Sequence, residues 1–295
     1  MADLAYYCLW AAVALTAAAL LGNLVLLTGR RTAAERKPHS NDASGAVVGD
    51  ERVVAKVGSV AWVATLLIRL AAIVMTASLV FRIIAVGHAP FSNQHEFACA
   101  FFWGILLAYV FFEWRYRIRM LAIGALPLAF IAGIYAAAGT DHSVDSLLPA
   151  LQNHLLLTAH VITAVLGYGA AAVSCAAAFL YLIAPKVRWR GMPAQDLLDE
   201  IGYKGIVFAF PLLTIMLVLG ALWADIAWGK YWSWDPKETA ALVTWLIYGA
   251  YLHARVTHGW QGNRSAWLLM LGFVAIVFTF TGNYWFGGLH TYGGQ

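Results

Sequence analysis

The chain has 295 residues, of which 62% are hydrophobic and only 12% are charged, with a formal net charge of +4. A soluble domain has about 25% charged residues, so this composition excludes an ordinary soluble protein. The small basic excess also gives no indication of a nucleic-acid partner. Repeated apolar runs of about 20 residues predict an all-α, polytopic integral membrane protein. We place about eight transmembrane spans, in chain order, at residues 4–27, 59–86, 97–112, 118–138, 153–184, 203–224, 238–255 and 265–285.

The connections between these spans alternate in charge. Lys and Arg gather in the first, third, fifth and seventh connections, at 30–56, 115–119, 186–190 and 255–264. Because basic loops favour the cytoplasmic side, both termini are predicted to lie outside the cytoplasm. We interpret residues 1–295 as a single membrane domain, with a polar cytoplasmic linker at 28–58 and an external Trp-rich loop at 223–240.

A dense aromatic stretch separates the sixth and seventh spans, and its sequence over 228–238 is Trp-Gly-Lys-Tyr-Trp-Ser-Trp-Asp-Pro-Lys-Glu. Asp235, Pro236 and Glu238 have the order of an N-cap, a first helical residue and a capping box, so the seventh span is predicted to start here. The candidate ligand platform comprises four rings: Trp228, Tyr231, Trp232 and Trp234. From composition, an interfacial anchor and a platform for a large flat ligand are both open readings.

The aromatic stretch and its surroundings resemble a known family. Tyr-Trp-Ser-Trp-Asp-Pro-Lys-Glu-Thr, followed by Leu-Val-Thr-Trp-Leu-Ile-Tyr, resembles the WWD signature of the CcsA (ResC) family of System II cytochrome c biogenesis. Further matches lie at 87–93 (Gly-His-Ala-Pro-Phe-Ser-Asn), 210–214 (Phe-Pro-Leu-Leu-Thr) and 288–293 (Gly-Leu-His-Thr-Tyr-Gly). Ala240 and His95 depart from the residues usual in the family. The resemblance implies haem b as the ligand and a multi-pass location in a bacterial plasma membrane or a plastid thylakoid membrane.

The resemblance also implies three axial ligands of haem iron. His160 and His290 would hold haem externally above the Trp-rich surface, with Asp235 part of the platform, and His253 would hold it within the membrane. No second histidine of this chain is predicted at the depth of His253, so the other ligand would come from a CcsB (ResB) partner. On the residues alone, His160 is equally a packed core histidine, His290 is more often a solvated residue, and His253 is an interfacial histidine in about one case in three. His88 could orient the site, but packing within its loop is the simpler explanation.

The implied function is attachment of haem to the Cys-x-x-Cys-His cysteines of apocytochrome c. The chain would act with CcsB/ResB as a cytochrome c synthase (haem lyase), and a thiol-reducing system would keep the cysteines reduced. No catalytic residue is assigned, because the thiols belong to the substrate. Asp235 and Glu238 could move protons, but helix capping accounts for both.

Three alternatives belong to other classes of protein. A haem exporter would hand haem to a separate ligase. A quinol-oxidising cytochrome b would need two histidine pairs on facing helices, whereas only His160 and His253 fall inside the predicted spans, with His154 at the outer end of one. A transporter of another amphiphilic solute would be colourless when purified.

Overall fold

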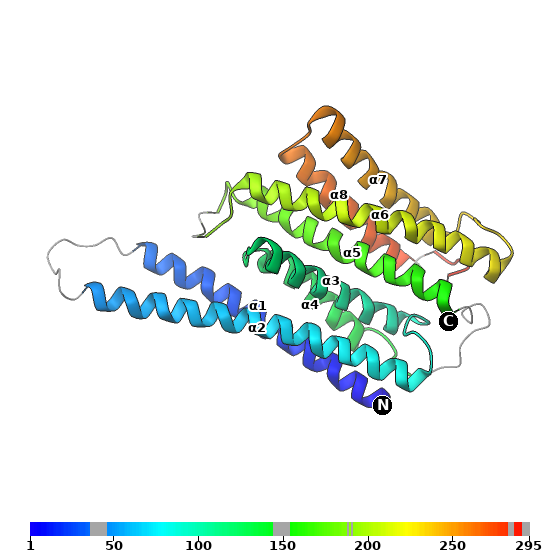
Figure 1. Ribbon diagram of the computed structural model, residues 1–295, viewed down its shortest axis with the longest axis horizontal. Helices are drawn as coiled ribbons and strands as arrows, with labels where there is room; N and C mark the ends of the chain where they lie inside the picture. The colour runs from blue at the N-terminus through cyan, green and yellow to red at the C-terminus, as the bar shows by residue number, and fades with distance from the viewer. Residues whose placement is uncertain (36–45, 144–153, 188, 190, 283–285, 291–295) are drawn as a thin grey trace.

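The computed structural model describes residues 1–35, 46–143, 154–187, 189, 191–282 and 286–290, and within these ranges it has helices and no strand. The helices are α1 (Ala2–Glu35), α2 (Ala46–Val86), α3 (Gln94–Tyr116), α4 (Leu121–Ala138), α5 (His154–Ile183), α6 (Gln195–Trp228), α7 (Pro236–His258) and α8 (Asn263–Thr281). Consecutive helices run in opposite directions through one elongated bundle (Figure 1). The all-α prediction is therefore confirmed.

Seven of these helices are long and apolar enough to cross a membrane, which confirms a multi-pass membrane protein. In the described part of the chain, α7 is the helix that falls short of this criterion. Its first turn carries Glu238 and its last turn carries Arg255 and His258, so its mean hydropathy is lower. It still has 23 residues and lies beside α6 and α8 (Figure 1). An eighth span, like the orientation of the termini, stays a prediction.

Most helices extend past the apolar runs that predicted them, at one end or at both: α1, α2, α3, α6, α7 and α8. Helices α4 and α5 lie within their predicted runs. Helix α6 begins at Gln195 rather than near 203, and α3 spans 23 residues instead of the expected 97–112. Within the predicted linker 28–58, α1 continues to Glu35 and α2 begins at Ala46, while 36–45 lie outside the described residues. Within the predicted Trp-rich loop, helix occupies both ends and the connection itself is 229–235. Backbone hydrogen bonding carries a helix beyond the hydrocarbon layer, so apolarity alone underestimates its length.

Helix α5 lies at the centre of the bundle, and its candidate span is the most buried, at 78%. Small residues allow its neighbours to approach closely. A Cβ at Gly169 would overlap the backbone oxygen of Gly104 on α3, and a Cβ at Gly205 on α6 would overlap the Ser174 hydroxyl. Close backbone contact of this kind is typical of helix packing in membranes. It places α5 in a fixed position between α3 and α6, and with it His160 near its N-terminal end.

A buried ion pair holds the connection between α2 and α3. Arg82 Nε donates to Glu96 Oε1 over 2.9 Å, and the two side chains are 6% and 1% exposed. The remaining guanidinium nitrogens donate to the carbonyl oxygens of His142 and Ser143, both over 2.8 Å. Glu96 Oε2 accepts from the backbone and hydroxyl of Ser92. A buried pair persists when such hydrogen bonds satisfy it, so this network fixes the loop that begins α3.

Candidate functional site

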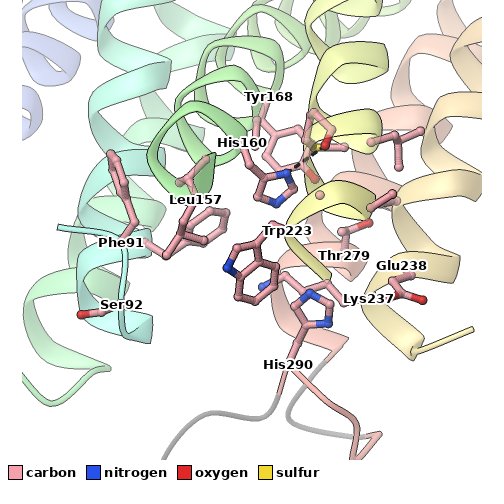
Figure 2. Close-up of a pocket in the computed structure, with 18 of the residues that line it drawn as sticks. Phe91, Ser92, Leu157, His160, Tyr168, Trp223, Lys237, Glu238, Thr279 and His290 are labelled. Carbon is pink, nitrogen blue, oxygen red and sulfur yellow. Dashed lines mark hydrogen bonds between the residues drawn. The ribbon is translucent and has the colours of Figure 1, made fainter. Parts of the chain in front are cut away.

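An aromatic pocket opens at the end of the bundle where α5 begins, α6 ends and α7 begins (Figure 2). The hollow has an accessible volume of about 140 Å³ and is open on one side. We call it the aromatic pocket, after the rings that line it: Phe91, Phe97, Tyr168, Trp223, Tyr231 and Trp232. His160 and His290 also line it, although 130 positions separate them in the sequence. Sites for drug-sized ligands have volumes of about 300–1,000 Å³, so a sizeable organic group would occupy this hollow with part of it outside.

His160 reaches the pocket from the first half of α5. Its Nδ1 lies 2.8 Å from the backbone oxygen of Met216 on α6. A carbonyl oxygen can only accept, so Nδ1 carries the proton and the lone pair of the neutral ring is on Nε2. Gly220 of α6 makes room for this ring, because a Cβ there would lie 2.7 Å from His160 Cε1. A backbone acceptor on the second nitrogen is the usual support of a ligating histidine.

His290 reaches the same pocket from the C-terminal tail. Its Nδ1 lies 2.9 Å from Asp235 Oδ1, and its side chain is 15% exposed. The backbone N–H of Leu289 donates to Asp235 Oδ2 over 2.7 Å, so two bonds tie the tail to one carboxylate. The ring packs edge-on against Trp228, with 4.8 Å between the ring centroids. The arrangement orients the Nε2 side of His290 in the way that Met216 orients His160.

The charges of the His290–Asp235 pair follow from its surroundings. Burial lowers the pKa of His290, and the hydrogen bond to Asp235 offsets only part of that shift. Burial of Asp235 raises its pKa, but the bond from His290 and the backbone N–H groups of Lys237 and Leu289 outweigh burial and bring it to about 2. At neutral pH the pair is a carboxylate and a neutral imidazole. A neutral imidazole is the form that binds a metal.

The capping box predicted at the start of α7 is present. Asp235 accepts from the backbone N–H of Lys237 over 2.9 Å, and Glu238 Oε2 accepts from the backbone N–H of Asp235 over 3.2 Å. Glu238 also accepts from the Ser233 backbone over 2.8 Å, which closes the loop before the helix. Asp235 therefore has two structural roles: it begins α7 and it orients His290.

The four rings of the predicted platform are placed differently. Tyr231 and Trp232 line the pocket. Trp228 packs behind the pocket, against His290 and edge-on to Trp223. Trp234 is 68% exposed and meets Trp232 edge-on at 5.8 Å, outside the residues that line the hollow.

Trp223 is a further ring of the site, outside the four rings of the predicted platform. It is 2% exposed, lines the pocket, and lies between His160 and His290 in the view of Figure 2. Its indole N–H has no hydrogen-bond partner among the described residues. Lys237 also lines the pocket, with Nζ 5.1 Å from the centre of the Phe97 ring. Both side chains could donate to a ligand acceptor, and the place of Trp223 one turn from Gly220 on α6 was the signal that could have found it.

The remaining predicted residues lie elsewhere. His253 is exposed near the other end of α7, with its ring edge-on to His258 at 6.0 Å, so it is not part of the aromatic pocket. His88 lies in the loop before α3, beside the Ala89 carbonyl at 2.8 Å, and it does not line the hollow. No group of three or more metal-ligating side chains occurs among the described residues.

Comparison with known proteins finds a matching family. The model of the cytochrome c assembly protein family matches residues 91–290. The cytochrome c biogenesis protein CcsA of Guillardia theta is 35% identical over 251 residues, covering 76% of this chain and 83% of that protein. CcsA of Chlamydomonas reinhardtii is 32% identical and covers 92% of this chain and 78% of that protein. CcsA of Prochlorococcus marinus (strain NATL2A) is 33% identical and covers 78% of this chain and 84% of that protein.

A solved structure shares the fold. The cytochrome c haem lyase CcmF superposes with a TM-score of 0.63 at 18% identity, covering 95% of this chain. The chain spans 46% of that longer protein. At this identity, the likeness concerns the arrangement of the helices.

Proposed function

Because the chain belongs to the cytochrome c assembly protein family, we propose that its aromatic pocket binds haem b and presents it for attachment to apocytochrome c. Two neutral histidines, His160 and His290, are the axial ligands, each through Nε2. The single observation that carries the proposal is that both line one pocket with Nδ1 bonded to an acceptor, Met216 oxygen or Asp235. Two histidine ligands leave no open position on the iron for dioxygen.

The rest of the pocket suits the shape and polarity of haem. Tyr231 and Trp232 offer flat apolar surface to the porphyrin. The propionates are anionic, and the Trp223 N–H and the Lys237 ammonium are two of the donors in the lining that could meet them. The pocket faces the extracytoplasmic side, where apocytochrome c is matured.

Attachment is an addition reaction. The S–H of each cysteine of the Cys-x-x-Cys-His segment adds across a vinyl C=C of haem: a sulfur–carbon bond forms at the inner vinyl carbon, the proton passes to the outer one, and the π bond is consumed. No electrons are gained or lost overall, but the thiols must be reduced beforehand, which is the task of a thiol-reducing system. This chain contributes by holding haem in position, so it acts as a haem lyase component without a nucleophile of its own.

A second station lies at the other end of α7. His253 is 18 residues after Asp235, which is about 27 Å along a helix. His253 is exposed on the surface of α7, where a second membrane protein can reach it, and we assign the opposite ligand to a partner of the CcsB (ResB) type. Haem enters through this station and then reaches the aromatic pocket.

The test uses the chain co-purified with its CcsB-type partner, in cells that also produce a c-type cytochrome. We expect His160→Ala and His290→Ala to remove haem from one site, seen as a reduced Soret band, and to abolish covalent cytochrome c detected by haem staining. His142→Ala is the matched control, because His142 is exposed at the same end of the bundle and does not line the pocket. Unchanged haem content and unchanged assembly in both pocket variants would refute the ligand assignment.

The same preparation separates this function from haem export. An exporter that serves another ligase would bind haem in the pocket but leave apocytochrome unmodified when the two are mixed under reducing conditions. For the second station, His253→Ala is compared with His258→Ala, which removes the neighbouring exposed ring. Loss of haem in the first variant alone, restored by added imidazole, is the result expected of an axial ligand.

A further inference from the structure

A second large cavity lies at the end of the bundle opposite the aromatic pocket. It has an accessible volume of about 660 Å³, is open to the outside, and is bounded by α1, α2, the α3–α4 connection and the segment before α6. We call it the arginine cavity, because Arg69, Arg117 and Arg119 line it. Among the described side chains of the lining, one acidic residue, Glu113, stands against these three arginines, so their formal charge is +2. The haem path proposed above involves none of these residues.

Each arginine is placed in a way that needs an explanation. Arg69 lies within the candidate span of α2 and is exposed, and a charge at such a position is costly unless it faces a polar cavity or a partner. Arg117 ends α3 in the left-handed backbone region, with φ of 56°. A glycine is usual at such a position, and a bulky residue there is strained. Arg119 is 49% exposed and lies 3.8 Å from Glu113, beyond hydrogen-bond distance.

Glu113 gives an independent indication of a ligand. Its side chain is 6% exposed, and its Oε1 accepts from the Thr65 hydroxyl over 2.9 Å. Its Oε2 is buried and has no hydrogen-bond partner among the described residues. An unpaired buried carboxylate oxygen costs free energy, so a donor from outside the chain is expected there. The cavity therefore offers cations for an anion and, beside them, an acceptor for a donor.

We propose that the arginine cavity binds the headgroup of a membrane phospholipid. The phosphate lies among the arginines, whose planar guanidinium groups suit phosphate oxygens. A hydroxyl or ammonium donor of the same headgroup bonds Glu113 Oε2. Basic pockets between membrane helices are known headgroup sites, and Trp114, which lines the cavity and is 65% exposed, provides an interfacial ring beside the acyl chains.

The carboxylate distinguishes this ligand from haem. Haem propionates would meet the arginines equally well, but they carry no donor for Glu113 and would repel its charge. Phosphatidylethanolamine and phosphatidylglycerol combine a phosphate with a donor. Phosphatidylcholine has the same phosphate and net charge as phosphatidylethanolamine, but its quaternary ammonium has no N–H. That pair of lipids isolates the role of Glu113.

The experiment measures lipid binding by native mass spectrometry of the chain purified with its partner and stripped of lipid. We expect phosphatidylethanolamine and phosphatidylglycerol to bind about tenfold more tightly than phosphatidylcholine, as a charge-assisted hydrogen bond predicts. Arg117→Gln should weaken all three lipids, and Glu113→Gln should abolish the preference for donor headgroups. Arg264→Gln is the matched control, since Arg264 lies in the first turn of α8, over the Trp260 ring and outside the cavity.

Three results would overturn the proposal. One is equal binding of phosphatidylethanolamine and phosphatidylcholine together with no effect of Arg117→Gln. Another is displacement of the lipid by inorganic phosphate at similar concentration, which would reduce the site to an anion site. The third is displacement by haem with an accompanying Soret band, which would make the cavity part of the haem path.

Because Glu113 is buried, retention of the haem spectrum of the aromatic pocket serves as the folding check for Glu113→Gln. The exposed Arg117 provides a second, independent variant.

Discussion

Gly220→Ala removes no functional side chain, yet it is expected to destroy the aromatic pocket. The added Cβ would lie 2.7 Å from His160 Cε1 and 3.0 Å from its Nδ1, both closer than such contacts allow. The backbone of α6 is held by its own helix, so the imidazole has to move. Moving it breaks the 2.8 Å hydrogen bond from Nδ1 to Met216 and turns Nε2 away from the pocket.

The cost to overall stability should be small. A Gly→Ala change in a helix interior normally stabilises by about 0.8–1 kcal/mol. Loss of the hydrogen bond costs about 0.5–1.5 kcal/mol, and a strained rotamer costs about as much again. The net loss is therefore about 1 kcal/mol, which leaves the protein folded. The signature is a near-normal melting temperature in detergent together with loss of haem from one site and of cytochrome c assembly.

Gly22→Ala is the matched control for this experiment. Gly22 is also inside a helix, α1, and an added Cβ there would meet the Cβ of Ala64 at 3.4 Å, an ordinary contact. We expect it to bind haem normally and to melt at the same temperature or slightly higher. If Gly220→Ala kept its full Soret band and full assembly activity, the position of His160 described here would not be the one that binds haem, and the reasoning would be refuted.

Three further predictions concern the tail and the loop network. Gly288→Ala would bring a Cβ into contact with Asp235 Oδ2, so we expect release of the tail and loss of haem from the pocket, measured by the Soret band, without loss at His253. The pKa of His290 is lowered by burial, so the folded chain binds fewer protons at this site than the unfolded chain. The contribution of neutral His290 to the free energy of unfolding is therefore complete above about pH 6.5 and falls as the pH drops below that value. Thermal melts from pH 8 to 5 would detect this fall. Arg82→Gln would leave the Glu96 carboxylate buried without its cation, and we expect a loss of about 3–5 kcal/mol in unfolding free energy, whereas a loss below about 1 kcal/mol would show that water reaches the pair.

Much of the fold could be predicted from apolarity alone, because a membrane requires helices of a certain length. The helix ends could not, since they depend on caps and loops outside the bilayer. The capping box at Asp235 was predictable because its residues lie within four positions of one another. The second role of Asp235, its hydrogen bond to His290, was not predictable. Nothing near Asp235 in the sequence indicates a bond to a residue 55 positions away. The same holds for Gly220 and Met216, whose contacts with His160 exist only after α5 and α6 pack.

The two pocket histidines are supported from different elements, which has a consequence for assembly of the site. His160 depends on the backbone of α6, and His290 depends on the carboxylate that begins α7. The residues between those two supports are the Trp-rich connection, 229–235. The length of this connection therefore sets the distance between the two histidine supports. Its rings Tyr231 and Trp232 line the aromatic pocket. A change in the length of this connection would shift α7 and His290 together against His160, even with every ring and histidine retained. The aromatic stretch thus matters for the spacing it imposes on the histidines as well as for its surface.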